Sequence, residues 1–257
     1  MSKPEISIVL PGIRQQNWDA VYDSIVASTK KTFELIICGP FPLTPQLEVI
    51  NCVKYVKDYG SPVRASQIAA SMCEGELVTW IADDGILLPD SLDKNIDLLR
   101  SMGDNNKNVV VTKYYEGKNG TEKPLQPDNY FKLNGSDWTS SPFISKEWWL
   151  FNVAIIHRTF FEELGGWDSL YEGTFYSHAD MAVRAQYLGA NVKMSDFPLL
   201  NCDHEQLDHA PIESAQIIHD KPLFQSRYRN PSWTMGEMRL DINNWKDSSA
   251  VWKRRFG

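Results

Sequence analysis

The sequence has few cysteines and no long apolar run. Its four cysteines show no CxxC spacing, which argues against a zinc ribbon or a redox dithiol. The longest apolar stretch, Trp148 to Ile156, is interrupted by Asn152 and is too short to span a bilayer. The first residues also lack the pattern of a signal peptide. We therefore expect a cytoplasmic protein without a transmembrane segment.

Basic residues and phosphate-binding loops are also scarce. The chain holds 26 Lys and Arg against 33 Asp and Glu, a net charge of −7, whereas a nucleic-acid surface needs clustered Lys and Arg. We therefore expect no nucleic-acid partner. Neither a P-loop motif nor a GxGxxG motif occurs. Hydrophobic residues make up 42% of the chain, which is enough for a full core.

Short apolar runs alternate with helical patterns through the first half of the chain. We predict strands at 6–10, 34–38, 53–56, 77–81 and 109–112, and helices at 17–28, 63–73 and 91–102. This alternation is typical of an α/β fold with a mixed, mostly parallel sheet flanked by helices. Ligands bind such sheets beyond the carboxyl ends of the strands. The residues at those ends include Pro11, Arg14, Gly39, Asp58, Arg64, Asp83 and Asp84.

The second half is less regular. The polar segment 114–145 has little periodicity, which is typical of a functional loop or of disorder. Regular structure is expected to return at Trp148, and we predict a helix at 178–188 and a strand at 197–202. The expected organisation is one domain over residues 1–230, with halves at 1–113 and 114–230, and a tail over 231–257 that packs on it.

The adjacent carboxylates of Asp83 and Asp84 follow a predicted buried strand. Two such groups repel each other and lose hydration, which is costly unless a cation or hydrogen-bond donors compensate them. Hard oxygen ligands suit Mg²⁺ or Mn²⁺, and these ions bind diphosphates. The alternative is a plain turn at the end of the strand, since Asp and Gly are ordinary turn residues.

Several segments together resemble the family-2 glycosyltransferases of the GT-A fold. The order and spacing of the matches span residues 5–205, with ISIVLP at 6–11, FELII at 33–37, GSPVRA at 60–65, LVTWIADDGILLPDSL at 77–92, FNVAIIHR at 151–158 and FEELGGWD at 161–168. The resemblance implies a metal-assisted, inverting transfer of a sugar from a nucleotide donor, with a UDP-sugar as first choice. It implies a glycan, a lipid-linked sugar or a protein hydroxyl as acceptor. It also divides the domain into a donor half, 1–113, and an acceptor half, 114–230.

The resemblance assigns residues to the metal and to the donor. Asp84 is the first choice of metal ligand, Asp83 faces the ribose or the same metal, and His204 lies where many GT-A enzymes place a further ligand. Arg64 lies near the position of a basic residue that faces the diphosphate. Arg64 could equally be a surface residue at a helix start, and His204 part of a surface cluster.

The base-binding part of the donor site departs from the family. Members place an Asp after the second strand, where this chain has Cys38, Gly39 and Pro40. Base recognition then requires backbone groups or another side chain, for which Asp58 is a candidate. The identity of the nucleotide stays open.

The catalytic base is also uncertain by sequence. Inverting members carry a Glu-Asp pair where this chain has Ser177 and His178, and the nearest carboxylate is Asp180. Either His178 or Asp180 could accept the acceptor's proton. Alternatively, Asp180 only pairs with Arg184 on a helix face, and His178 is a plain helix-start residue.

The aromatic pair Trp148 and Trp149 could stack on an acceptor sugar, although a Trp pair in an apolar run is more often core. Scattered Lys and Arg near the end of the chain would allow peripheral contact with an anionic membrane, or are simply solvated. Two other functions compete with the transferase. One is a nucleotidyltransferase, and the other is a non-catalytic relative that binds a nucleotide or a sugar.

Overall fold

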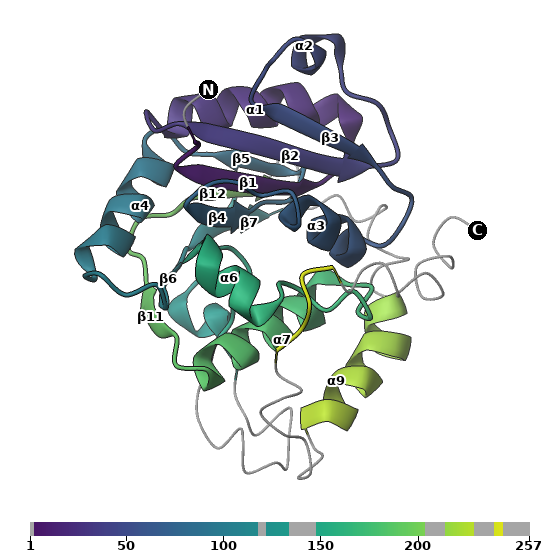
Figure 1. The fold of residues 1–257 in the computed structure, drawn as a ribbon, viewed down its shortest axis with the longest axis vertical. Coiled ribbons are helices and arrows are strands. Elements are labelled where there is room, and N and C mark those ends of the chain that lie inside the picture. Colours follow the sequence, from purple (N-terminus) through teal and green to yellow (C-terminus); the bar gives the residue numbers. More distant parts are fainter. Residues whose placement is uncertain (1–2, 118–121, 134–147, 204–213, 229–238, 244–257) are drawn as a thin grey trace.

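A seven-stranded mixed sheet forms the centre of the computed structural model, which describes residues 3–117, 122–133, 148–203, 214–228 and 239–243 (Figure 1). The strand order is β11-β6-β10-β4-β1-β2-β3. In chain order the strands are β1 (Ile6–Pro11), β2 (Phe33–Gly39), β3 (Val53–Lys57), β4 (Leu77–Trp80), β6 (Asn108–Val111), β10 (Ala154–His157) and β11 (Asn191–Met194).

All pairs in this sheet are parallel except those of β10, which runs antiparallel to β4 and β6. The mixed, mostly parallel α/β sheet expected from the sequence is therefore confirmed. Strands β1, β2, β4 and β6 match the predicted positions within two residues at either end. They are continuous buried apolar runs, as expected of strands covered on both faces.

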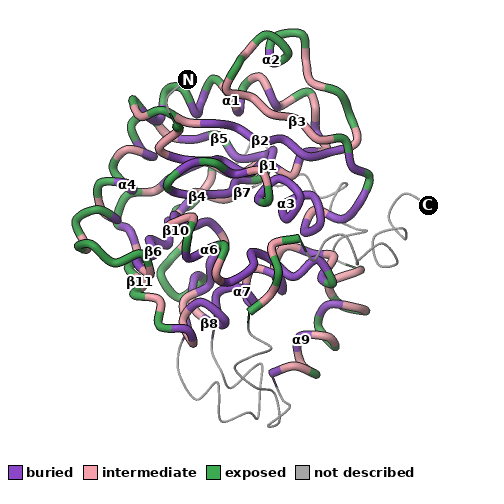
Figure 2. The backbone as a smooth tube through the Cα atoms, in the orientation of Figure 1, coloured by how far each residue is buried: buried purple, intermediate pink, exposed green. Residues whose placement is uncertain are grey.

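Helices cover both faces of the sheet (Figures 1 and 2). Helices α1 and α4 contact each other on one face, and α3, α6 and α7 contact one another on the other. The helices are α1 (Trp18–Ser28), α2 (Pro45–Glu48), α3 (Pro62–Ala70), α4 (Ser91–Ser101), α6 (Arg158–Leu164), α7 (Thr174–Tyr187) and α9 (Lys221–Tyr228). Helix α3 begins where the sequence favours it, because the Ser61 side chain caps the Arg64 amide at 3.2 Å and Pro62 occupies the first turn.

A second, three-stranded sheet lies beside the first and has the order β5-β12-β7. It consists of β5 (Gly85–Leu87), β12 (Leu200–Asp203) and β7 (Tyr114–Gly117), while β8 (Lys132–Leu133) pairs with β9 (Trp148–Trp149). Strand β5 follows the Asp83-Asp84 pair directly, so the two sheets join at these carboxylates.

Several boundaries differ from the sequence-based expectation. The segment 114–145 contains β7 and β8, although its polar composition predicted no regular structure. Helix α7 begins at Thr174, four residues before the predicted start, so His178 lies in its second turn. Strand β12 begins at Leu200, not at 197.

The near-terminal segment 239–243 packs on the body of the domain. The Gln67 amide donates to the carbonyl oxygens of Gly165 and Ile242, at 2.7 and 2.8 Å, and its own oxygen accepts from the Trp167 amide at 2.7 Å. Gly165 takes a left-handed conformation, with φ of 76°, and lies against Leu240. Among the described helices, none is long and apolar enough to cross a bilayer.

Candidate functional site

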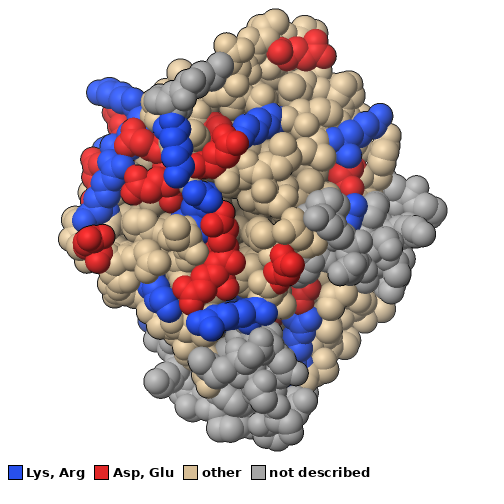
Figure 3. Space-filling model, viewed as in Figure 1, with Lys and Arg blue, Asp and Glu red and all other residues tan. Residues whose placement is uncertain are grey.

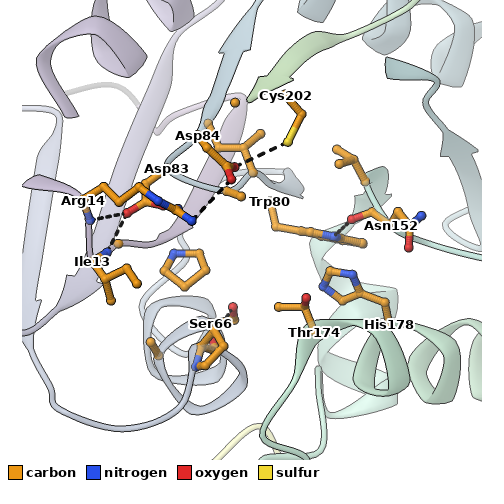
Figure 4. Close-up of a pocket in the computed structure, with 18 of the residues that line it drawn as sticks. Ile13, Arg14, Ser66, Trp80, Asp83, Asp84, Asn152, Thr174, His178 and Cys202 are labelled. Atoms are coloured by element: carbon orange, nitrogen blue, oxygen red, sulfur yellow. Dashed lines mark hydrogen bonds and ion pairs between the residues drawn. The ribbon is translucent and has the colours of Figure 1, made fainter. Parts of the chain in front are cut away.

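A cavity of about 360 Å³ lies at the carboxyl ends of β1, β2 and β4 and extends to helix α7 (Figure 4). Seven of the residues selected from the sequence line it, namely Pro11, Arg14, Gly39, Asp58, Asp83, Asp84 and His178. They meet because parallel strands bring their carboxyl ends to one edge of the sheet. Among the described residues, Arg64, Asp180, Trp148 and Trp149 do not line this cavity.

Asp83 holds the loop that follows β1. One carboxylate oxygen accepts the amide hydrogens of Ile13 and Arg14, each at 2.6 Å, and the other accepts from the Arg14 guanidinium. The Asn17 side chain also donates to the Asp83 carbonyl at 3.0 Å. The charge of this buried carboxylate is thus compensated by donors of the protein itself.

Asp84 faces the cavity with a different set of neighbours. One oxygen lies 3.5 Å from the Arg14 guanidinium, and the other accepts from the Cys202 thiol at 3.5 Å. Burial, followed by the adjacent Asp84 charge, raises the pKa of Cys202, so the thiol keeps its proton and remains a donor.

The loop after β3 carries a third carboxylate into the cavity wall. Asp58 accepts from the Gly60 amide at 2.9 Å and pairs with the Arg64 guanidinium at 3.1 to 3.2 Å. Arg64 therefore fixes Asp58 in place. Gly39, at the end of β2, lies so close to β1 that a Cβ there would overlap the carbonyl oxygen of Gly12. That close approach explains why no side chain projects into the cavity from this position.

His178 reaches the cavity from α7. Its ring lies against those of Trp80 and Trp167, with centroids 5.9 and 6.1 Å apart. Desolvation by these neighbours lowers the pKa of His178 to about 3. The half-buried imidazole is therefore neutral at pH 7 and can accept a proton only weakly.

Asp180 is buried away from the cavity, between α7 and α9. It accepts from Arg184 Nε at 2.7 Å, from the Tyr228 hydroxyl at 2.8 Å and from Arg227 at 3.3 Å. Burial by itself would raise the pKa of Asp180, but the two guanidinium groups outweigh it and lower the pKa. The predicted pairing with Arg184 is present, although it is buried and not on an exposed face.

The two tryptophans singled out in the sequence belong to a different place. Trp148 is part of the buried core, and Trp149 packs against it with Lys132 Nζ 5.2 Å from its ring centroid. The candidate metal ligand His204 lies outside the described residues. Within the described part of the chain, no three His, Cys, Asp or Glu side chains gather as a ready-made metal site.

The fold matches that of S. aureus TarS. The crystal structure of TarS residues 1–349 gives a TM-score of 0.55 over 98% of this chain and 74% of that one. The same fragment in complex with UDP gives 0.56 over 91% and 68%. The chain has the GT-A fold. Sequence identity is 14% in both cases, and no protein-family model and no curated protein matches the sequence.

A longer TarS structure gives a TM-score of 0.55 at 14% identity, over 84% of this chain and 40% of that one. This chain therefore spans less than half of TarS as seen there. The GT-A fold that the sequence resemblance implied is confirmed, and the strand-end position of the cavity agrees with it.

The lining residues that sequence reasoning missed include a group that lies together, namely Tyr114, Glu116, Tyr130 and Asn152. Tyr114 and Glu116 follow a predicted strand, so the rule that selected Asp83 would have selected them too. Asn152 was visible as the one polar interruption of an apolar run. Tyr130 gave no signal in its polar surroundings.

The described lining of the cavity is acidic. It contains four carboxylates, Asp58, Asp83, Asp84 and Glu116, and the Arg14 guanidinium is the one Lys or Arg side chain among its described residues. On the outer face shown in Figure 3, by contrast, acidic and basic side chains lie interspersed.

Proposed function

We propose that this protein is a metal-assisted glycosyltransferase that moves a sugar from a nucleoside diphosphate, with UDP as first choice, to a hydroxyl of a glycan, a lipid-linked sugar or a protein. The observation that carries the proposal is the position of Asp84. It projects from a strand end into an acidic cavity, in a fold that TarS shares and that binds UDP in TarS.

The acidic lining favours a divalent cation. Asp83 pairs with the Arg14 guanidinium and Asp58 with that of Arg64, which leaves Asp84 and Glu116 to repel a strongly negative diphosphate. Mg²⁺ and Mn²⁺ need only one or two carboxylates when substrate phosphates and water complete the shell. Asp84 fits that role because it borders the cavity beside Asp83, whose two oxygens are both bonded to Arg14 and Ile13. His204 remains a candidate for a further ligand.

The other residues at the strand ends would position the donor nucleotide. Asp83 fixes the loop that carries Arg14, whose guanidinium is then positioned beside the diphosphate. Asp58, held by Arg64, is placed to accept hydrogen bonds from the base or ribose. The bound metal would stabilise the charge that develops on the departing diphosphate.

His178 is our choice of base over Asp180, because only His178 borders the cavity. Its neutral imidazole can hydrogen-bond the acceptor hydroxyl and take its proton as that oxygen attacks the anomeric carbon. The nearby negative diphosphate would raise the pKa of His178 from its low value in the free protein. Attack from the side of α7, opposite the strand ends, corresponds to an inverting transfer.

The test is a thermal-shift titration of UDP, GDP, CDP and dTDP, each with Mn²⁺ and with EDTA, on the wild type and on Asp84→Asn. We expect one nucleotide to raise the Tm of the wild type with metal only, and the variant to lose that shift. Glu122→Gln is the matched control, since it removes one exposed acid outside the cavity lining. Absence of a shift with every nucleotide would refute the proposal.

A non-catalytic nucleotide-sugar-binding protein is the second candidate. It is favoured by the low pKa of His178 and by the engagement of Asp180, which leave α7 without a strong base. The two candidates differ in turnover. Release of UDP from a UDP-sugar and an acceptor panel supports the transferase, whereas metal-dependent binding without release supports the second candidate.

A further inference from the structure

Four polar side chains lie together on the cavity wall. The Asn152 amide donates to the Tyr114 hydroxyl at 3.2 Å, and burial, followed by the neighbouring Tyr130 and Glu116, raises the pKa of Tyr114. The two tyrosine rings meet edge to face, with centroids 6.1 Å apart. All four residues line the cavity, and none has a role in the proposal above.

These side chains are separated from Asp84 by one strand, β12. Strands β7 and β12 are parallel neighbours, and Glu116 pairs with Cys202 in their register. Residues paired in register project from the same face of a sheet. The Cys202 thiol in turn donates to Asp84. A sugar attached to a diphosphate held at Asp84 would therefore lie next to Glu116 and the tyrosines.

The chemistry of this wall suits a sugar. Aromatic rings pack on the C–H faces of sugars, while a carboxylate and an amide bond their hydroxyl groups. Glu116 also adds a negative charge beside the charges of Asp84 and of the diphosphate. A carboxylate on the sugar itself would be repelled by these charges.

We propose that Glu116, Tyr130 and Tyr114 form the subsite for the transferred sugar, and that this subsite accepts a neutral hexose and rejects a hexuronate. The inference rests on the proposed function, because it takes the diphosphate at Asp84 as given. It goes further by naming the class of sugar and the residue that selects it.

The test compares the affinities of UDP, UDP-glucose and UDP-glucuronate in Mn²⁺ by calorimetry. We expect the wild type to bind UDP-glucose at least as tightly as UDP, and to bind UDP-glucuronate about tenfold or more weakly, because like charges several ångströms apart repel at a partly dry site. In Glu116→Gln, the affinities for UDP-glucose and UDP-glucuronate should differ by no more than about threefold. Its affinity for UDP itself should stay unchanged.

Two further variants keep the inference open to refutation. Tyr130→Phe retains the Glu116 charge and removes one hydroxyl. It should therefore lower the affinity for UDP-glucose relative to that for UDP, and should still bind UDP-glucuronate more weakly than UDP-glucose. Glu122→Gln changes the net charge equally at an exposed position outside the cavity lining, and should keep the full discrimination.

The outcomes separate the two proposals. Equal binding of both sugar nucleotides by the wild type, or a discrimination that survives in Glu116→Gln, overturns the sugar subsite alone. A wild type that does not bind UDP in Mn²⁺ overturns the UDP donor site together with the subsite. A Glu116→Gln variant that fails to bind UDP shifts the decision to Tyr130→Phe, where an unchanged UDP-glucose affinity overturns the subsite.

Discussion

The imidazole of His178 has aromatic rings on two sides, and burial lowers its pKa to about 3 from an ordinary value near 6.5. Between these two pH values the unfolded chain binds a proton that the native protein does not. The stabilising effect of a neutral His178 is thus complete above pH 6.5 and is lost as the pH falls toward 3. The free energy of unfolding should fall by up to about 1.4 kcal/mol per pH unit from this group.

In His178→Gln, the free energy of unfolding should therefore fall less steeply as the pH is lowered. The measurement is urea denaturation of both proteins at several pH values between 7 and 4. The pKa of His157 is also lowered by burial, so His157→Gln shows how much acid sensitivity arises outside the cavity. Parallel curves for the wild type and His178→Gln would contradict the assignment of a desolvated, neutral imidazole.

The adjacent Asp83 and Asp84 should respond differently to the same substitution. Asp83→Asn removes the charge that compensates Arg14 and one acceptor of a buried cluster, so we expect a loss of about 3–5 kcal/mol in the free energy of unfolding. Asp84→Asn keeps a side chain of the same shape and loosens the 3.5 Å contacts to Arg14 and Cys202, so it should cost less, about 1 kcal/mol. Chemical denaturation measures both. Equal losses would show that Asp84 is as structural as Asp83.

At the scale of elements, α7 is fixed to α9 by a buried ionic cluster around Asp180. Arg184, Arg227 and Tyr228 all contact this carboxylate. Asp180→Asn should lower the free energy of unfolding by about 3–5 kcal/mol, because it removes the carboxylate that pairs with the buried Arg184 guanidinium, whereas Arg227 keeps its ion pair with Asp168. Nucleotide affinity of the folded protein should not change.

The control for Asp180→Asn is Glu162→Gln on α6. That glutamate also pairs with an Arg four residues away, here Arg158, but at the surface. An exposed pair of this kind contributes at most about 0.5 kcal/mol. An Asp180→Asn variant as stable as Glu162→Gln, with activity lost, would restore Asp180 as the catalytic base.

The elements differ in how far the sequence could predict them. Strands β1, β2 and β4 are buried on both faces, so their apolar runs are unambiguous. Strand β10 lies inside the apolar run 148–156, where composition does not distinguish a strand from a buried helix, and its antiparallel pairing depends on long-range contacts. The early start of α7 also escaped prediction, because Thr174 and Phe175 have no strong helix signal.

The same difference applies to the site. Strand ends followed by Asp or Gly could be recognised locally, which is why Arg14, Asp58 and Asp83 were selected. The roles of His178 and Asp180 could not be recognised from the local sequence, because they depend on which face of α7 meets the cavity. That face is set by packing against Trp80 and α9, which no local pattern reports.

At the scale of the whole molecule, acidic side chains outnumber basic ones both in the full chain and around the cavity. The net charge is −7, and four carboxylates line the described part of the cavity against two guanidinium groups, that of Arg14 in the lining and that of Arg64 paired with Asp58. The field at the cavity should therefore repel a free nucleoside diphosphate and attract a divalent cation. Salt screens both effects, since the Debye length falls from about 30 Å at 0.01 M to about 10 Å at 0.1 M ionic strength.

The salt dependence of UDP binding should therefore reverse with the metal. In EDTA, the weak affinity should rise as salt increases, because screening relieves repulsion. In Mn²⁺ it should fall, because the attraction of the metal to Asp84 and its acidic neighbours is screened. Calorimetry at both ionic strengths measures the two slopes. A falling affinity in EDTA would mean that the ligand meets net positive charge, and the argument for a metal from the acidic cavity would then fail.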